Sequence, residues 1–491
     1  MNEETALEKE RRGKIARWRS EGREPFPWSF PGRVSTDVVR TACARLRPGE
    51  SDSAHLLKVA GRLRAVRVHG RTAFADLDDL AGALQLLLRV DELGDAAYAA
   101  WLSDLDPGDI VGAEGVPAVS RRGEPSLLVH ALTLLAKAVS PPPEKYHGLQ
   151  DAEERIRRRY LDLMASPESR RRFQVRSMLV RETRSHLDDA GFLEVETPVL
   201  LPVASGAAAQ PFVTRSNYLG EEVQLRIALE LPLKRLLVGG LERVYEIGKV
   251  FRNEDLDSIH SPEFTMLEAY WAYADYHDMR QLVEGLYARL GRRTEELLPD
   301  HPVAKEAARA FEAGFATVDF LDELERRSGL SDLLSKSREE LRTLARSIGS
   351  TVPDDSPAGV FLDKLFEHYV EPTLTAPTFV VDHPLSTTPL AKRHRSKTGR
   401  VERFEFYYRG FELGNAYTEL NDADEQERRF REQLGQRGED HYAYDDDFVR
   451  ALRFGLPPTT GIGIGIDRMA MALTGAPSIK DVILFPLART K

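Results

Sequence analysis

The sequence predicts an α+β fold in which a small N-terminal β-barrel precedes a larger domain with a mainly antiparallel sheet. Strand-like segments broken by one helical segment fill residues 56–135, and a proline-rich stretch follows at 140–148. Beyond it, strand-like segments resume after a helical block, which indicates one domain with an insertion. The predicted parts of the 491-residue chain are a helical extension at 1–50, a barrel at 51–140, a linker at 141–166 and a larger domain at 167–491 with a helical insertion at about 275–370.

The composition is that of an ordinary globular protein, with 42% apolar and 30% charged residues. The longest apolar runs, such as residues 83–90, are too short to cross a bilayer. The acidic N-terminus has no apolar signal core, so we expect no secretory signal. The single cysteine, Cys43, excludes an internal disulfide and a multi-cysteine zinc site. These features predict a cytoplasmic protein without a membrane segment.

The N-terminal extension begins with a helix at residues 5–22, which the prolines and glycine of residues 24–32 terminate. Three strands, one helix and two strands then follow, an order typical of a Greek-key barrel of the OB type that also fits other small barrels. Although the net charge is −10, residues 56–89 carry six basic residues against three aspartates, a local charge of +3. A nucleic-acid-binding face would explain this charge, but on charge alone we favour a solvated surface.

The proline-rich stretch 140–148 predicts a stiff linker and a domain boundary. After an arginine-rich helix, Ser166 is a candidate N-cap and Pro167 a first-turn residue of a long helix that Gly191 ends. The apolar, β-branched residues 192–201 then predict a strand.

Glycine occupies every second position of residues 461–465, so one face of the predicted strand has no side chains and a flat group can lie against it. Asp467 and Arg468 begin the helix that follows. The spacing differs from the G-x-G-x-x-G fingerprint of dinucleotide-binding folds and lies near the C-terminus, which argues against that interpretation. Arg468 is placed to stack on a base or bind a phosphate, although close packing of strand on helix explains the glycines equally well.

A two-residue loop at Arg409-Gly410 predicts a β-hairpin in which Tyr407 pairs with Glu412. Alternation then places Glu405 and Glu412 on one face, where two carboxylates either share a cation such as Mg²⁺ or belong to a solvated surface.

Strict alternation turns Asn415 and Glu419 to the opposite face of the hairpin. A role shared with Glu412 therefore requires a bulge, for which Gly414 is the natural position.

The segment from Phe251 to Tyr270 combines charged and aromatic residues between two strands. Arg252 is suited to grip a carboxylate or phosphate, and Phe264 to stack on a purine. Acids in the same segment would serve ammonium groups or a metal. Upstream, Glu230 follows a strand and opens a helix, where placement in the first turn is the simpler explanation.

Taken together, these motifs resemble those of the class II lysyl-tRNA synthetases over nearly the whole chain. Residues 192–201 are similar to the first class II motif, which the family uses at its homodimer interface. Residues 252–264 are similar to the second motif and residues 461–468 to the third, with Asp467 where many relatives have Glu. Shorter matches lie in the expected order at 59–67, 143–149, 157–164, 389–395, 412–422 and 481–489.

The resemblance implies a set of site residues. The cations expected to act in catalysis are Arg252 and Arg468. ATP would be bound by Arg252, Glu254, His260, Phe264 and Arg468. The substrate L-lysine would be bound by Gly206, Glu230, Glu268, Tyr270, Asn415 and Glu419. The family's magnesium ligands match Glu405 and Glu412. The residues that would contact the tRNA anticodon are Arg67, Phe74, Gln85 and Glu124.

The resemblance also implies the reaction. Lysine and ATP form lysyl-adenylate with Mg²⁺ as cofactor, and a homodimer transfers lysine to the 3′ end of tRNA(Lys). A buried Glu419 facing the ε-ammonium group would also give selectivity, since leaving it unpaired costs about 3–5 kcal/mol.

The chain departs from the usual family pattern near the expected lysine site, where Ser205 replaces a Gly, Gln210 an Arg, Leu229 a Pro and Ser261 an Asn. Three other interpretations stay open at this point: a paralogue that lysylates a protein, a non-catalytic nucleic-acid-binding protein, and an aspartyl or asparaginyl enzyme. The barrel argues against the first of these. The set of Arg and Glu residues argues against the second, and the acid at Glu419 against the third.

Overall fold

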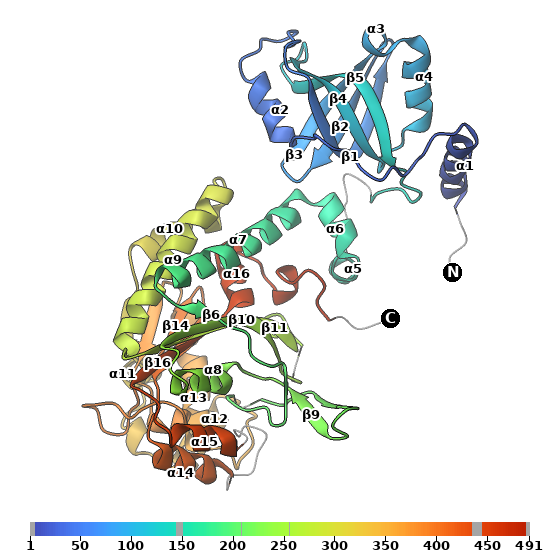
Figure 1. Cartoon of the computed structure of the whole chain (residues 1–491). Coiled ribbons are helices and arrows are strands. Elements are labelled where there is room, and N and C mark those ends of the chain that lie inside the picture. Colours follow the sequence, from blue (N-terminus) through green and yellow to red (C-terminus); the bar gives the residue numbers. More distant parts are fainter. Residues whose placement is uncertain (1–4, 144–150, 208, 255, 435–443, 488–491) are drawn as a thin grey trace. The chain divides into compact units, whose positions relative to one another are not determined.

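The computed structural model describes residues 5–143, 151–207, 209–254, 256–434 and 444–487. Most of the predicted linker stretch 140–148 lies outside these residues. The chain forms two compact units, Met1–Arg170 and Arg171–Lys491, which we describe separately (Figure 1).

The first unit contains the predicted barrel, which closes in the strand order β1-β2-β3-β5-β4. Alternate residues fill its interior, among them Val59, Leu77, Leu86 and Val129, as the two-residue period of a strand requires. The OB-type prediction is confirmed by this order and by the helices between β3 and β4. The elements are β1 (Leu57–His69), β2 (Thr72–Asp79), β3 (Gly82–Arg89), α3 (Val90–Leu93), α4 (Asp95–Asp104), β4 (Ile110–Val119) and β5 (Pro125–Ala136).

The N-terminal helices α1 (Ala6–Ser20) and α2 (Thr36–Cys43) both pack on the barrel, and each contributes to its apolar core, through Trp18 and through Val39 and Cys43. Arg11 is buried and donates to the carbonyl of Ala138 at 2.8 Å, and the indole of Trp18 donates to Asp104 at 2.8 Å. Part of the basic N-terminal stretch therefore docks the helix and does not face solvent.

The long helix α7 (Pro167–Asp189) begins as predicted, because the Ser166 hydroxyl accepts a hydrogen bond from the amide of Ser169 at 3.1 Å. It follows α5 (Ala152–Arg157) and α6 (Arg159–Ala165).

The continuous strand predicted at 192–201 is wrong. The structure has only β6 (Leu193–Glu194) and β7 (Leu200–Leu201), which belong to different sheets. Between them the amide and hydroxyl of Thr197 donate to the Glu246 side chain, and Pro198 has no N–H for a ladder.

The second unit is built on an eight-stranded sheet in the order β12-β13-β14-β15-β16-β11-β10-β6, beside a small sheet β7-β9-β8. Neighbouring strands of the large sheet are antiparallel except β6 with β10 and β12 with β13, within the described part of the chain, which confirms the mainly antiparallel prediction. The remaining strands are β8 (Val213–Arg215), β9 (Glu222–Leu225), β10 (Arg243–Phe251), β11 (Glu263–Ala272), β12 (Ala316–Asp319), β13 (Thr378–Val381), β14 (Arg403–Tyr408), β15 (Phe411–Thr418) and β16 (Thr459–Gly465).

The helical block expected at about 275–370 is mostly helical, but strand β12 lies within it and extends the sheet. Its helices are α9 (Tyr276–Leu297), α10 (Pro302–Glu312), α11 (Phe320–Ser328), η1 (Leu333–Ser335), α12 (Arg338–Ser347) and α13 (Ala358–Tyr369). The other helices of this unit are α8 (Glu230–Val238), η2 (Glu371–Thr373), η3 (Leu385–Thr387), α14 (Ala423–Leu434), α15 (Asp446–Leu452), α16 (Ile466–Thr474) and η4 (Ile479–Asp481).

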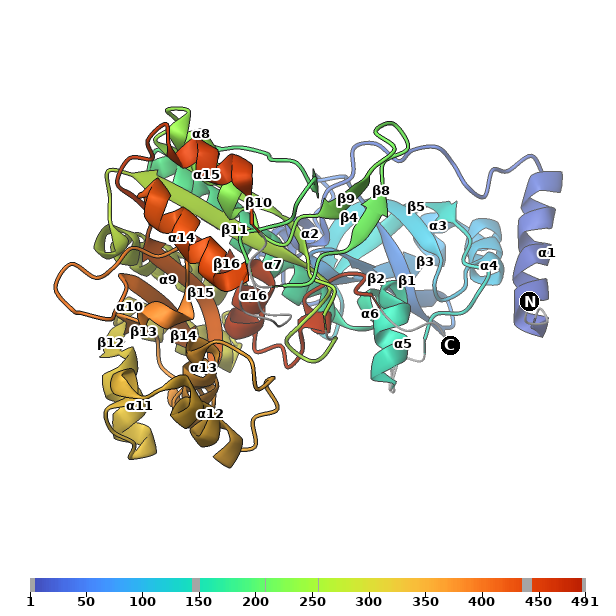
Figure 2. The same cartoon turned by 90° about the horizontal axis from the view of Figure 1, so that it is seen from below.

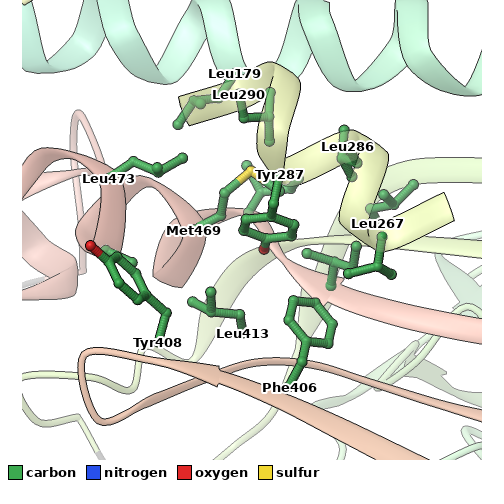
Figure 3. Close-up of a cluster of buried hydrophobic side chains, with 14 of the residues drawn as sticks. Leu179, Leu267, Leu286, Tyr287, Leu290, Phe406, Tyr408, Leu413, Met469 and Leu473 are labelled. Carbon is green, nitrogen blue, oxygen red and sulfur yellow. The ribbon is translucent and has the colours of Figure 1, made fainter. Parts of the chain in front are cut away.

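Helices cover both faces of the large sheet, as Figures 1 and 2 show. On one face α7, α9 and α16 enclose the main core, in which Leu179, Leu286, Phe406 and Met469 pack together (Figure 3). On the other face α8 and α15 enclose a smaller core. This second face also carries the polar residues of the candidate site.

The hairpin of β14 and β15 contains the bulge that the sequence predicts. Tyr407 lies opposite Glu412, but the next pair is Phe406 with Gly414, so Leu413 is the extra residue and points into the main core (Figure 3). A Cβ atom on Gly414 would lie 2.5 Å from the Gly463 carbonyl oxygen, which explains the glycine. Beyond the bulge Asn415 lies on the same face as Glu412.

Among the residues described, no helix combines the length and the apolar character needed to cross a membrane.

Candidate active site

A cavity of about 770 Å³ lies on the polar face of the large sheet, within the second unit. The predicted site residues that line it are Gly206, Glu230, Arg252, Glu254, His260, Phe264, Glu268, Tyr270, Glu412, Asn415 and Arg468. Two others, Glu405 and Glu419, are not among the residues that line it. Residues from five parts of the sequence thus converge on one cavity, although their roles stay predictions at this point.

The alternating glycines of β16 form part of the cavity wall, in two different ways. A Cβ atom on Gly461 would lie 2.2 Å from Oε1 of Glu419 and 2.3 Å from the Tyr270 ring, so this glycine makes room for neighbouring side chains. At Gly463 and Gly465 the nearest atoms would be 3.8 Å away, and the strand stays open to the cavity. Close packing therefore explains Gly461, whereas Gly463 and Gly465 leave the strand face open to the cavity.

One end of the cavity is a buried acidic cluster. Glu230, Glu268 and Glu419 are only 6%, 4% and 1% exposed, and Lys234 of α8 is fully buried between Glu230 and Glu419, with an ion pair to each. The hydroxyl of Tyr417 donates to Glu230 at 2.6 Å. Within the described residues Oε2 of Glu419 accepts no well-directed hydrogen bond, although Lys234 is in contact with it.

Glu268 is held by two donors. The amide of Leu229 donates to Oε1 and the hydroxyl of Tyr270 to Oε2, both at 2.8 Å. Burial raises the pKa of the Glu268 carboxyl to about 7, and the nearby charge of Glu230 acts in the same direction.

Burial also raises the pKa of Glu419 well above its ordinary value, although attraction to Lys234 opposes this effect. For Lys234 burial alone would lower the pKa, but Glu230 and Glu419 together raise it. The two carboxylates thus favour the charged form of Lys234.

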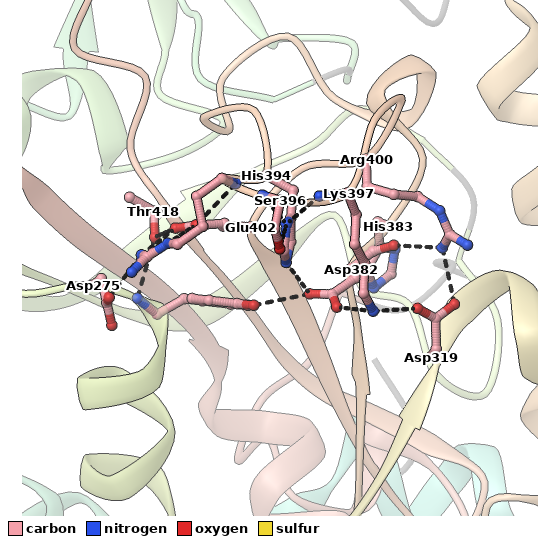
Figure 4. Close-up of polar contacts among 12 residues, drawn as sticks. Asp275, Asp319, Asp382, His383, His394, Ser396, Lys397, Arg400, Glu402 and Thr418 are labelled. Carbon is pink, nitrogen blue, oxygen red and sulfur yellow. Dashed lines mark hydrogen bonds and ion pairs between the residues drawn. The ribbon is translucent and has the colours of Figure 1, made fainter.

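Strand pairing and a polar network position Glu419. The amide of Glu419 donates to the carbonyl of Thr459 at 2.8 Å, and its backbone also pairs with Ala391. The segment containing Ala391 is anchored by the network in Figure 4, in which Glu402 accepts from Thr418 at 2.8 Å and binds Arg395. The match to the family at 389–395 thus coincides with a segment that supports the acidic cluster.

A second part of the cavity lining, its cationic end, contains Arg252, His260 and Arg468. Arg252 lies 5.3 Å from the centre of the Phe264 ring, and Arg468 donates to Nε2 of His260 at 3.2 Å and to Glu412 at 3.1 Å. Positive charge and an aromatic face here suit a nucleotide.

The middle of the segment 251–270, which sequence reasoning left unexplained, orients His260. The Asp257 side chain accepts from the amides of Ile259 and His260, both at 2.7 Å, and contacts Nδ1 of His260 at 2.8 Å. The carbonyl of Ser258 accepts from the Ile479 amide at 2.8 Å, which ties this loop to η4.

Asp467 supports the cationic end from the start of α16. Its carboxylate accepts from the Thr265 amide at 2.7 Å and from Arg176 at 2.6 Å. It thereby links β11, α7 and α16, so its role is structural.

The two predicted metal ligands lie close to further acids of the insertion. Glu405 accepts from Tyr407 at 2.7 Å and pairs with Arg403. Burial raises the pKa of Asp363 to about 8 and that of Glu371 to about 7, and Glu405 adds to both shifts. A bound divalent cation would compensate this excess of negative charge.

Of the four departures from the family pattern, Leu229 and Gln210 make backbone contacts to site residues. The Leu229 amide binds Glu268, and the Gln210 amide donates to Glu254 at 3.3 Å. Ser205 and Ser261 are both buried.

In the barrel unit the four predicted anticodon residues lie on strands β1 to β3 and on the turn before β5. Phe74 is half-buried on the outer face, opposite Arg67, so it is not a core aromatic. Arg67 forms a bidentate pair with Asp76 at 2.7 Å, and Gln85 accepts from Ser126 at 3.1 Å. Glu124 is exposed.

Sequence reasoning missed Lys234, Tyr417, Asp363 and Lys364 as residues of this site. Lys234 follows Glu230 by four positions on one helix, a spacing that brings opposite charges together and was available in the sequence. Lys364 lines the cavity from α13, which only the tertiary fold reveals.

Comparison with known proteins identifies both units. The family model for class II tRNA synthetases (D, K and N) matches residues 151–489, and the model for the OB-fold nucleic acid binding domain matches residues 57–135. The chain is 43% identical over 489 residues to the lysine–tRNA ligase of Shouchella clausii, covering 98% of this chain and 96% of the relative. It is 46% identical to that of Roseiflexus castenholzii, covering 99% of each, and 44% identical to that of Moorella thermoacetica, covering 97% and 96%.

The buried acidic cluster predicts how stability changes with pH. Because the pKa of Glu268 is about 7 in the folded protein against an ordinary 4.5, its contribution to the free energy of unfolding falls as pH rises from 4.5 to 7. We expect Glu268→Gln to raise the free energy of unfolding at pH 8 by up to about 3 kcal/mol, and to change it little at pH 4.5. Urea unfolding followed by tryptophan fluorescence at both pH values measures this. Glu263→Gln, on the same strand but exposed, is the control, and an equal effect at both pH values would contradict the assignment.

Proposed function

The chain belongs to the class II tRNA synthetases (D, K and N) and acts as a lysine–tRNA ligase, and from this premise we propose which of its residues recognise lysine, ATP and tRNA. The observation that carries the proposal is the buried acidic cluster. Three carboxylates, of Glu230, Glu268 and Glu419, against one ammonium group, of Lys234, leave two uncompensated negative charges when all are ionised.

Lysine brings the two ammonium groups that neutralise this cluster. The aspartate side chain is an anion and the asparagine side chain is neutral, so neither of the other two amino acids of the family completes it. Glu230 and the backbone at Gly206 take the α-ammonium group. Glu419 and Tyr270 take the ε-ammonium group, with Glu268 beside them.

The remaining contacts orient the reacting carboxylate of lysine. Asn415 accepts from Arg403 through Oδ1 at 2.9 Å, which leaves its Nδ2 group to donate to that carboxylate. Arg252 holds the same carboxylate and the α-phosphate of ATP, while Phe264 and Glu254 bind the adenine by face and by edge. His260 and Arg468 face the distal phosphates.

Positioning and charge stabilisation then account for catalysis. A carboxylate oxygen of lysine attacks the α-phosphorus of ATP, the bond to the β-phosphate oxygen breaks and pyrophosphate leaves. The terminal hydroxyl of tRNA next attacks the lysyl carbonyl carbon, and AMP leaves. Both nucleophiles belong to substrates, so the protein supplies cations such as Arg252 and Arg468 and no nucleophile of its own.

The carboxylates of Glu405 and Glu412 fit Mg²⁺, which neutralises phosphate charge when bound. Besides burial, Glu412 and Glu405 both raise the pKa of Glu371, so their charges act on the same place. Such a pair of carboxylates suits Mg²⁺ that phosphate oxygens of ATP complete.

Lysine-dependent exchange of pyrophosphate into ATP tests the lysine assignment. We expect exchange with lysine that stops when EDTA removes divalent cations and resumes with Mg²⁺. Glu419→Gln should raise the KM for lysine about 100-fold or more and change the KM for ATP less than about threefold. Asp424→Asn, exposed on α14, is the control. Equal losses for both substrates would contradict the assignment, and exchange without tRNA charging would point to a protein-modifying paralogue.

The barrel supports recognition of tRNA by stacking. Phe74 presents its ring on the outer face next to Arg67, and Gln85 lies on the adjacent strand. We propose that a base of the anticodon lies against Phe74, with Glu124 and Arg67 at its edges.

Phe74→Ala should lower kcat/KM for tRNA charging about 5- to 150-fold, since stacking contributes about 1–3 kcal/mol per base. Pyrophosphate exchange, which needs no tRNA, should stay unchanged. Tyr98→Phe, inside the barrel unit, is the control. Loss of exchange together with charging would show that the substitution damages folding and not stacking.

An apolar surface on the second unit supports a homodimer. The exposed apolar side chains of this surface come from β6 to β8 and the following turn: Leu193, Val199, Leu200, Val213, Tyr218 and Leu219. Exposed apolar side chains are typical of an interface, and three of these, Leu193, Val199 and Leu200, belong to the first class II motif.

Sedimentation velocity should give twice the monomer mass, and Leu200→Glu should shift the protein to the monomer because it buries a charge in the interface. Leu80→Glu, on an exposed turn of the barrel, is the matched control. A monomeric wild-type protein at micromolar concentration would refute the dimer.

A further inference from the structure

Lys234 is a cation inside the pocket that we assign to a cationic substrate. Its ammonium group contacts Glu230 and Glu419, the acceptors assigned to the α- and ε-ammonium groups of lysine. A like charge at this place repels the substrate, so its presence needs a physical reason.

The surroundings of Lys234 hold its charge in place. Helix α8 contributes Glu230, the end of β15 contributes Glu419 and Tyr417, and α15 contributes Phe448. The ammonium nitrogen lies 5.5 Å from the centre of the Tyr417 ring and 5.7 Å from that of Phe448. With no exposed surface, Lys234 cannot turn to solvent when substrate enters.

Strand β11 adds Glu268 and Tyr270 to the same cluster, and their hydroxyl–carboxylate bond is 2.8 Å long. Three carboxylates in one buried cluster cannot all stay ionised without a cation, because each desolvated charge is costly and neighbouring like charges repel. Without Lys234 at least one of the three would take up a proton and lose its ability to accept from an ammonium group.

We propose that Lys234 is a positioning residue for lysine recognition: it bridges Glu230 and Glu419, offsets their negative charge inside the protein, and sets the separation of the two ammonium acceptors. The inference rests on the proposed function of this pocket. Lys234 acts through the two glutamates and does not contact the reacting atoms.

The first test is Lys234→Met, which keeps the apolar stem and removes the charge. We expect the KM for lysine in pyrophosphate exchange to rise about 30-fold, with the KM for ATP changed less than about threefold. Burial raises the pKa of Glu419 and Lys234 lowers it, so without Lys234 this carboxyl ionises at higher pH. The acidic limb of the pH profile of kcat/KM for lysine should therefore move up by about one pH unit or more. An unchanged acidic limb, or equal losses for lysine and ATP, would overturn the proposal.

A double-mutant cycle tests whether Lys234 acts through Glu419. Because Lys234 also pairs with Glu230, the variant with both Lys234→Met and Glu419→Gln should have a KM for lysine at least about threefold below the value that the product of the two single effects predicts. Fully multiplicative effects of the two substitutions would overturn the proposal. This comparison also serves if Lys234→Met alone folds poorly, since the double variant buries one carboxylate fewer than Lys234→Met does.

The matched control is Lys137→Met in the barrel unit. Lys137 is equally buried and pairs with Asp106 and with Asp109, the latter at 2.8 Å. This variant should lose stability but keep the KM for lysine and the acidic limb; a shift of that limb here would overturn the proposal. If the wild-type protein shows no lysine-dependent pyrophosphate exchange, the proposed function itself is refuted. If the wild type exchanges normally and Lys234→Met has an unchanged KM for lysine, only this inference is refuted.

Discussion

The bulge at Leu413 and Gly414 is the constraint on which the site depends. Side chains of a strand alternate between faces, so a shift of one residue exchanges the two sets. Without the extra residue, Asn415 and Glu419 would point into the main core on the face opposite Glu412. With it, Leu413 fills the core, and the phosphate end and the lysine end of the site lie on one face of β15.

This shared face brings groups of opposite charge to one cavity. Glu230, Glu268 and Glu419 form the acidic cluster, while Arg252 and Arg468 also belong to the lining. An amino acid with a cationic side chain is oriented by these charges, with its ammonium groups at the acidic cluster and its carboxylate towards the arginines. Selectivity and the approach of the carboxylate to the α-phosphate thus follow from one arrangement of charges.

The features predicted correctly from the sequence are those set by neighbouring residues. The hairpin at Arg409-Gly410, its bulge and the cap at Ser166 each depend on a few adjacent positions. The errors concern long-range contacts. The strand expected at 192–201 breaks because Thr197 bonds to Glu246, some fifty residues away, and β12 forms in a helical block because β13 offers it an edge. Roles of individual site residues came from the family resemblance, since residue types alone left structural explanations open.

Leu229 shows why a departure from the family pattern need not weaken the site. The family usually has proline at this position, and proline has no amide hydrogen to donate. In this chain the Leu229 amide donates to Glu268 at 2.8 Å, and that bond lowers the carboxyl pKa against the effect of burial. Ionised Glu268 is the form that accepts an ammonium group, so the additional donor favours the binding-competent state. The Leu229 amide therefore favours the ionised form of Glu268, as Lys234 favours that of Glu419. Both groups help to maintain negative charge in the pocket before lysine binds.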